Sequence, residues 1–115
     1  MQYNNIIMEY KIKNYIKDNG TEPIVDWIKS LDATTRKRIL LRLDRLRDGN
    51  FGDYKQLNED LYELRFSFGS GYRIYYTIEH NIIILLINGG NKKTQAKDIK
   101  QANEIIKQMK GIYNE

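Results

Sequence analysis

The sequence predicts an α+β fold, in which a twisted and mainly antiparallel sheet packs against helices. Three observations carry this prediction. Apolar residues recur at helical spacing in the first half of the chain, alternate with polar residues in its middle, and return to helical spacing near its end. The expected order of elements is β-α-α-β-β-β-α. No repeat, low-complexity tract or linker divides the 115 residues, so we expect a single domain over residues 1–115.

The first elements are expected to be a strand and a short helix. The strand occupies Ile6–Ile12, which is an apolar stretch, and Asn19-Gly20 ends that region. Thr21 can cap a short helix that has Pro23 in its first turn. The apolar stripe of this helix consists of Ile24, Trp27, Ile28 and Leu31.

A longer helix follows, with Asp32 as its N-terminal cap and Gly49 at its end. Basic side chains crowd its outer faces, which is typical of a solvated surface but also suits a nucleic-acid backbone or an acidic protein segment. Its expected buried face consists of Ile39, Leu40, Leu43 and Leu46. The basic residues are Arg36, Lys37, Arg38, Arg42, Arg45 and Arg47.

Period-two alternation begins at Leu61, after a connecting loop over Asn50–Asn58. It predicts two strands that are joined by a hairpin turn at Gly69-Ser70-Gly71. A turn at His80-Asn81 leads into Ile82–Ile87, which is apolar throughout and suits a central strand covered on both faces. One side of the first two strands is apolar and consists of Tyr62, Leu64, Phe66, Phe68, Tyr72, Ile74, Tyr76 and Ile78.

Gly89-Gly90 closes the sheet segment, and a last helix is expected to begin near Thr94 or Gln95. Apolar residues at helical spacing define its buried face. They are Ile99, Ala102, Ile105, Ile106 and Met109.

Composition excludes several kinds of site. The chain has no cysteine and a single histidine, His80, which excludes a disulfide framework, a thiolate site and a histidine catalytic pair. It has no zinc-ligand spacing and no glycine-rich nucleotide loop, so we expect neither a metal nor a cofactor. We recognise no signal peptide or membrane span and expect a cytoplasmic protein. The net charge of +4 allows a nucleic acid or an acidic protein as partner.

Four residues on the polar side of the first two sheet strands form the main candidate site. Alternation and the hairpin place Arg65 and Arg73 on one face, together with Glu63 and Tyr75. A carboxylate among guanidinium groups would have a lowered pKa and stay ionised at neutral pH. The plainer interpretation is cross-strand ion pairing on a solvated surface.

A second cationic group, Lys92 and Lys93, follows the double glycine. Backbone can approach a ligand closely there, and the next helix offers free N–H groups, so a phosphate could bind. Alternatively, these are solvated lysines in a connecting loop. A cation-rich site with carboxylate and tyrosine groups suits phosphate transesterification in RNA, whose 2′-hydroxyl is the nucleophile. Glu63 is then a candidate proton acceptor and Tyr75 a candidate hydrogen-bonding or stacking group.

These residues belong to a series of short motifs in a characteristic order between Ile24 and Ile106. The motifs are Trp27-Ile28-x-Ser30-Leu31, the basic helix, Gly49-Asn50-Phe51-Gly52-Asp53, Glu63-Leu64-Arg65, Gly71-Tyr72-Arg73-Ile74-Tyr75-Tyr76 and Gly90-Asn91-Lys92-x-x-Gln95-Ala96-x-Asp98-Ile99. In this order the sequence resembles the RelE/ParE superfamily of toxins from bacterial type II toxin–antitoxin modules. It is most similar to the RelE/HigB-like "addiction module killer protein" branch.

The resemblance implies a RelE-like fold whose concave sheet cleaves messenger RNA, often in the ribosomal A site. It also implies a cognate antitoxin from the adjacent gene, expected to be a helix-turn-helix protein that covers the toxin in a hetero-oligomer. By position, Arg73 matches the family's phosphate-binding or transition-state-stabilising arginine. Arg65 matches a basic position on the preceding strand, and Lys92 or Lys93 matches the cation after the closing glycine.

The resemblance leaves the proton-transfer group open. Some RelE members have a lysine where Glu63 stands. The family's C-terminal catalytic tyrosine has no counterpart in this sequence, and Gln95 and Asp98 stand near its expected position. The predicted catalytic residues are Glu63, Arg65, Arg73 and Lys92. The predicted RNA-binding residues are Arg42, Arg45, Tyr75, Lys93 and Gln95.

Two other functions remain as alternatives. A ParE-like toxin would inhibit DNA gyrase through its surface and would not need cations that converge on the sheet. A basic nucleic-acid-binding domain without catalysis would bind in a salt-sensitive manner and would cleave nothing.

Overall fold

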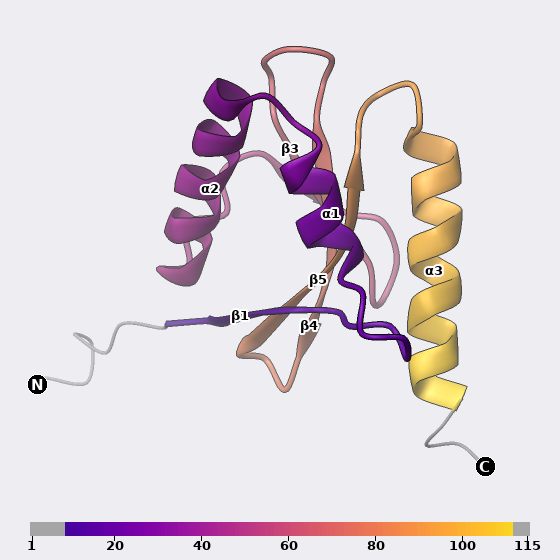
Figure 1. Ribbon diagram of the computed structural model, residues 1–115. Coiled ribbons are helices and arrows are strands. Elements are labelled where there is room, and N and C mark those ends of the chain that lie inside the picture. The colour runs from indigo at the N-terminus through magenta and orange to yellow at the C-terminus, as the bar shows by residue number, and fades with distance from the viewer. Residues whose placement is uncertain (1–8, 112–115) are drawn as a thin grey trace, which may run out of the picture.

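The computed structural model describes residues 9–111, and it confirms the predicted α+β fold (Figure 1). The elements are β1 (Lys11–Asn14), α1 (Pro23–Lys29), α2 (Ala33–Arg47), β2 (Tyr54–Gln56), β3 (Tyr62–Arg65), β4 (Arg73–Glu79), β5 (Ile83–Gly90) and α3 (Gln95–Gly111). The first strand therefore begins later than the expected Ile6–Ile12, of which residues 6–8 lie outside the described part of the chain.

The five strands form one sheet in the order β1-β5-β4-β3-β2. β1 runs parallel to β5, and the remaining neighbours are antiparallel. Helices α2 and α3 lie on opposite sides of this sheet (Figure 1). One strand is a correction to the sequence prediction, because β2 occupies part of the expected loop Asn50–Asn58.

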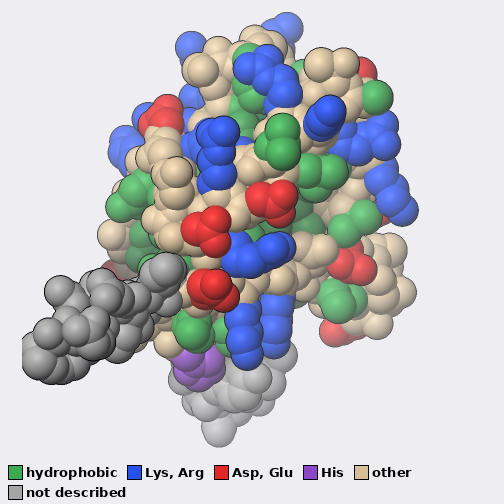
Figure 2. All heavy atoms as spheres, turned by 90° about the vertical axis from the view of Figure 1, so that its left-hand side faces the viewer, with side chains coloured by type: hydrophobic (Ala, Val, Ile, Leu, Met, Phe, Trp, Pro, Cys, Tyr) green, Lys and Arg blue, Asp and Glu red, His purple; other side chains and the backbone are tan. Residues whose placement is uncertain are grey.

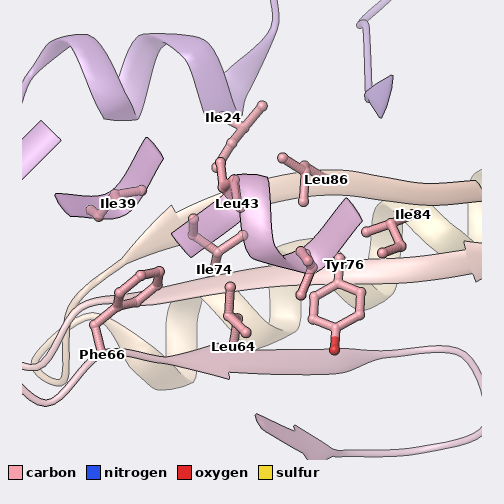
Figure 3. Close-up of a cluster of buried hydrophobic side chains, with 10 residues drawn as sticks. Ile24, Ile39, Leu43, Leu64, Phe66, Ile74, Tyr76, Ile84 and Leu86 are labelled. Carbon is pink, nitrogen blue, oxygen red and sulfur yellow. The ribbon is translucent and has the colours of Figure 1, made fainter. Parts of the chain in front are cut away.

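The sheet face under α1 and α2 carries the larger apolar cluster (Figure 3). Leu64 and Ile74 are fully buried there between neighbouring strands and α2, as the alternation predicts. Leu40 is an exception among the residues expected in this core, because its side chain is 46% exposed. The buried members of this cluster are Ile24, Ile39, Leu43, Leu46, Leu64, Phe66, Ile74, Tyr76, Ile84 and Leu86.

The opposite sheet face packs on α3. Its buried apolar cluster comprises Leu61, Tyr75, Ile87, Ala102, Ile105 and Ile106. The predicted apolar face of the last helix is thus confirmed, and β5 is covered on both sides as expected. The polar side of the hairpin is not simply solvated, however, because α3 closes over part of it and buries Tyr75 and Glu63 completely.

Helix ends and turns follow mostly from the local sequence. Asp32 caps α2 by accepting a hydrogen bond from the Thr35 N–H, and Gly49 after the helix has a positive φ of 82°. His80 and Asn81 take φ values of 54° and 61° in the predicted turn. The expected cap at Thr21 is wrong, since the N-terminal position of α1 is Glu22, which makes no capping bond.

A register shift interrupts the pairing of β4 with β5. Tyr75 lies opposite Asn88, whereas the next residue, Tyr76, lies opposite Leu86, so Ile87 has no partner of its own. Ile87 packs on α3, and the Asn88 amide donates to the Asp98 carbonyl of the same helix. Two successive residues of β5 therefore face α3, which is the signature of a β-bulge.

The two glycines after the bulge face opposite layers. A Cβ at Gly89 would collide with the Trp27 ring of α1, and a Cβ at Gly90 would collide with the Asp98 carboxylate of α3. Both helices can approach the end of β5 closely because these positions carry no side chain.

Candidate functional site

A buried carboxylate organises the candidate site. Glu63 is 0% exposed. Its two carboxylate oxygens accept hydrogen bonds from Arg65 Nε (2.8 Å), Tyr75 Oη (3.1 Å) and Gln95 Nε2 (2.7 Å), and Arg73 Nε lies 3.5 Å away. We call these five residues the Glu63 cluster.

Strand register brings four members of this cluster together. Glu63 pairs with Tyr75 and Arg65 pairs with Arg73 across β3 and β4. Opposite residues of an antiparallel pair lie on the same face, and residues two apart do so as well. The predicted convergence of these four side chains is confirmed. Gln95, at the first position of α3, then reaches over the sheet to complete the cluster.

Hydrogen bonding sets the charge of Glu63. Burial alone would raise the pKa of this carboxyl group, but the hydrogen bonds from Arg65, Gln95 and Tyr75 outweigh it and hold the pKa below its ordinary value. The hydrogen bond that Arg65 donates to Glu63 in turn raises the pKa of Arg65. Burial and the adjacent Glu63 carboxylate raise the pKa of Tyr75. At neutral pH the cluster is therefore a carboxylate held by cations and a neutral phenol.

Solvent reaches the arginines and not the carboxylate. The Arg65 side chain is 34% exposed and that of Arg73 is 14% exposed. Arg73 also donates from Nη1 to the Gly71 carbonyl at 3.1 Å. The outer boundary of the cluster is therefore formed by two guanidinium groups whose positions are fixed from beneath.

Lys92 lies next to Arg73 across Gly71. A Cβ at Gly71, which has a φ of +74°, would stand 3.4 Å from Lys92 Cβ and 3.6 Å from Arg73 Nη1. The Lys92 N–H points at the Ser70 carbonyl at 3.4 Å, which ties the hairpin tip to the loop after β5. The predicted catalytic residue Lys92 is thus a neighbour of the cluster, and its side chain is exposed.

The loop after β5 is held by its own polar groups. Asn91 Oδ1 accepts from the N–H groups of Lys93 (2.9 Å) and Thr94 (3.2 Å), and the Thr94 hydroxyl donates to the buried Asp98 carboxylate. The N–H groups that sequence reasoning offered to a phosphate at Lys93 and Thr94 are therefore already used. Sequence reasoning missed this network, although Asn-x-x-Thr before a helix is a recognisable capping pattern.

Three predicted RNA-binding residues have structural tasks instead, and one of them is Gln95, whose amide donates to Glu63. Tyr75 is 0% exposed and packs under α3, so its ring cannot stack on a ligand at the surface. Arg42 donates to three backbone carbonyls, those of Arg65 (2.8 Å), Phe51 (3.0 Å) and Asp53 (3.0 Å). Arg45 and Lys93 are exposed, and they lie apart from the cluster's hydrogen bonds.

Residues 9–111 have neither a cluster of metal-binding side chains nor a membrane-spanning helix. That part of the chain holds no group of three or more His, Cys, Asp or Glu residues arranged to hold a metal ion. None of its helices combines the length and the apolar character needed to cross a membrane.

Comparison with known proteins shows the family to which the chain belongs. The sequence model of the phage-derived protein Gp49-like family (DUF891) matches residues 26–110. The chain belongs to the Gp49-like family. A protein of Haemophilus influenzae, described as uncharacterized, is 39% identical to it over 84 residues, which cover 72% of this chain and 85% of the Haemophilus protein. The Gp49-like match spans the whole Glu63 cluster and Lys92, and it agrees with the broad resemblance to toxin–antitoxin toxins.

Proposed function

We propose that this protein is the toxin of a type II toxin–antitoxin module and that it cleaves RNA without a metal ion. The observation that carries the proposal is the buried, ionised Glu63, which holds Arg65 and Arg73 side by side with Lys92 as their neighbour. Membership of the Gp49-like family, a family of such toxins, supports the broader part of the proposal. The assignment to a RelE/HigB-like branch rests on the motif resemblance alone.

The proposed reaction uses the nucleophile of the RNA itself. The 2′-hydroxyl attacks the adjacent phosphorus, a new P–O2′ bond forms, the P–O5′ bond breaks, and the products carry a 2′,3′-cyclic phosphate and a 5′-hydroxyl. The 2′-hydroxyl proton passes to water, and the leaving 5′-oxygen takes a proton from water. Arg73, Arg65 and Lys92 would bind the phosphate and stabilise the extra negative charge of the pentacoordinate transition state.

Glu63 fits a positioning role better than that of a proton acceptor. Its oxygens already accept three hydrogen bonds, it is inaccessible to solvent, and its pKa is lowered. A general base needs a free lone pair within reach of the substrate proton and a pKa near the working pH. In our proposal Glu63 and Gln95 fix the arginines in place before RNA arrives.

The resemblance supplies the proposed partners. We infer a cognate antitoxin, encoded beside the toxin and expected to be a helix-turn-helix protein, that forms a hetero-oligomer with this chain. We further infer that messenger RNA is the substrate, that cleavage takes place on the ribosome, and that the protein acts in the cytoplasm. The adjacent reading frame provides a direct check of the first inference.

Expression without the antitoxin tests the proposal. Growth should stop, and RNA fragments should carry 2′,3′-cyclic phosphate ends. Arg73→Ala should keep its circular dichroism spectrum and lower the cleavage rate on message-loaded ribosomes by roughly 10²–10³-fold, which is typical for loss of one donor to a developing oxyanion. Lys37→Ala, which removes an exposed charge from α2, is the matched control and should cleave normally.

Two results would count against RNA cleavage. One is message that stays intact on ribosomes at a high protein concentration. The other is growth arrest with intact RNA and loss of DNA supercoiling, which would favour the ParE-like alternative. Normal cleavage by Arg73→Ala would remove this residue from the site.

A further inference from the structure

A second cationic surface lies on the other side of β3 from the Glu63 cluster. It is a hollow of about 320 Å³ between the outer side of α2 and the residues that follow β3. We call it the basic hollow. Three arginines and no acidic residue are among the residues that line it, which are Arg38, Leu41, Arg42, Arg45, Phe66, Ser67 and Phe68. Its size falls within the range of small-ligand sites.

Arginine–aromatic packing shapes the basic hollow. The Arg38 guanidinium carbon lies 3.7 Å from the centre of the Phe68 ring, and that of Arg42 lies 5.0 Å from the centre of the Phe66 ring. Arg38 is an exposed residue, so its guanidinium group stays accessible to a ligand while it lies over the Phe68 ring. A guanidinium group that lies over an aromatic ring can form a platform on which a nucleobase stacks.

Arg45 supplies the hollow with a cation that is not committed to a partner. It is exposed, and no ion pair is formed by its side chain within residues 9–111. Arg47, two residues along the same helix, pairs instead with Asp44. Figure 2, which looks onto the α2 side of the molecule, shows Lys and Arg side chains spread over this face, with Asp and Glu side chains among them.

The basic hollow and the Glu63 cluster meet at Arg65. The Arg65 side chain bonds Glu63 on one face of the sheet, while its backbone carbonyl accepts from Arg42 Nη1 on the other side at 2.8 Å. Only Phe66 and Ser67 separate Arg65 from the Phe68 platform in sequence. A chain bound at the Glu63 cluster would need to cross only the end of β3 to reach the hollow.

We propose that the basic hollow binds the nucleotides of single-stranded RNA that flank the cleaved phosphate, with a base on the Arg38–Phe68 platform and a phosphate at Arg45. This inference rests on the proposed function. An acidic protein segment would satisfy the cations but would leave the stacking platform unused, so the combination favours RNA. Arg42, which clamps three carbonyls, shapes the hollow and is not its main ligand.

Binding measurements with RNA of two lengths test this surface. The probe is fluorescently labelled 2′-O-methyl RNA, which cannot be cleaved because its 2′-oxygen is blocked, and the full chain is used throughout. The short probe has two nucleotides and covers only the Glu63 cluster; the long probe has about ten nucleotides, a typical site length for such grooves. The variants of the hollow are Arg38→Ala, Arg45→Ala and Phe68→Leu. Arg73→Ala reports on the Glu63 cluster, and Lys37→Ala is the control.

We expect Arg38→Ala to weaken binding of the long probe about tenfold through loss of stacking. Arg45→Ala should reduce the slope of log affinity against log salt by about 0.7, the value for one phosphate of a single strand. Neither variant should alter binding of the short probe, and Lys37→Ala should alter neither. Phe68→Leu, which keeps an apolar side chain but removes the ring, should reproduce the Arg38→Ala effect.

Three outcomes would overturn the proposal in distinguishable ways. If Arg38→Ala and Arg45→Ala bind the long probe as tightly as wild type does, while Arg73→Ala binds it more weakly, the hollow is not an RNA site. The proposed function would then be unaffected. Unchanged RNA binding together with weakened binding of the antitoxin would assign the hollow to a protein. Absence of binding of the long probe by the wild-type chain would refute the hollow as an RNA site, while cleavage of message on ribosomes would still test the proposed function separately.

Discussion

The two faces of the sheet are built from the same strands but bury different kinds of side chain. The face under α1 and α2 buries apolar side chains along its whole length. The face under α3 is apolar over part of its length and holds a fully buried carboxylate at Glu63. Alternation alone assigns each residue to one face or the other, while the covering helix decides whether a polar residue there is solvated or buried.

The α3 side of the sheet shows how a small protein can hold a charged site rigidly. A buried charge is costly unless it is paired and hydrogen-bonded. Glu63 meets that requirement with donors from β3, β4 and the start of α3. Because three elements contribute, any ligand that binds Arg65 and Arg73 meets side chains that are already oriented.

Truncation on the apolar face should have the largest effect on folding. Leu64→Ala removes a fully buried side chain and should lower the free energy of unfolding by about 3 kcal/mol. RNA cleavage per folded molecule should stay near wild type, because Leu64 points away from Glu63. Urea unfolding and ribosome cleavage assays measure the two quantities, and Ile16→Ala, at a side chain 58% exposed, is the control. A large loss of cleavage by folded Leu64→Ala would mean that the faces are not independent.

Neutralising the buried carboxylate should have an intermediate and pH-dependent effect. Glu63→Gln should lower the free energy of unfolding at pH 7 by about 2 kcal/mol, the scale of hydrogen bonds to a charged group. The folded pKa of Glu63 lies below its ordinary value of 4.5. Its contribution is therefore fully present above pH 4.5 and is lost as the pH falls through the lower folded value.

The difference in the free energy of unfolding between wild type and Glu63→Gln should accordingly become smaller at acidic pH. Urea unfolding of both proteins at pH 7 and near pH 3 would measure it, with the exposed Glu59→Gln as control. Cleavage by Glu63→Gln at pH 7 should also fall, because Arg65 and Arg73 lose their anchor. A gap that stays constant with pH would show that the carboxylate charge does not stabilise this face.

Adding a side chain at Gly71 should have the smallest of these effects on the free energy of unfolding, but it should still disturb the cations of the site. Gly71→Ala should cost about 1 kcal/mol for a left-handed backbone and should place a methyl group between Lys92 and Arg73. Displacing these cations should lower cleavage by about tenfold. Gly20→Ala is a close control, because Gly20 also has a positive φ, +88°, but a Cβ there meets no atom within 4 Å. Equal cleavage by the two variants would mean that the space at Gly71 is unimportant.

Much of the fold was predictable because its signals are local. The cap at Asp32, the stop at Gly49 and the alternation of β3 and β4 depend on neighbouring residues. The strand β2 was not predictable, because all three of its residues are exposed and only pairing with β3 holds them. Parallel pairing of β1 with β5 likewise leaves no mark in either segment.

The sequence was sufficient to predict most of the residues that form the candidate site, but not how deeply they are buried. Strand spacing is sufficient to converge Glu63, Arg65, Arg73 and Tyr75. Strand spacing does not reveal that α3 lies over these residues or that Gln95 donates to the Glu63 carboxylate. Nor does it reveal that the Arg42 guanidinium group donates to three backbone carbonyls. These contacts depend on tertiary packing. The sequence signals that packing only through the apolar face of α3, which must be buried against some other surface.

The bulge at Ile87 has a consequence for insertions and deletions. Upstream of it β5 alternates in one phase, and downstream in the other, so that Gly89 meets Trp27 and Gly90 meets Asp98. Deleting Ile87 would restore a regular ladder and keep Gly89 and Gly90 on the same layers, but it would remove a fully buried side chain from the α3 cluster. Adding or deleting one residue after the bulge would exchange the layers that the following strand residues face. Loops usually tolerate changes in length, whereas this strand should accept substitutions more readily than any change of length. Among relatives of this chain, the number of residues between Leu86 and Asp98 is therefore expected to vary less than their identity.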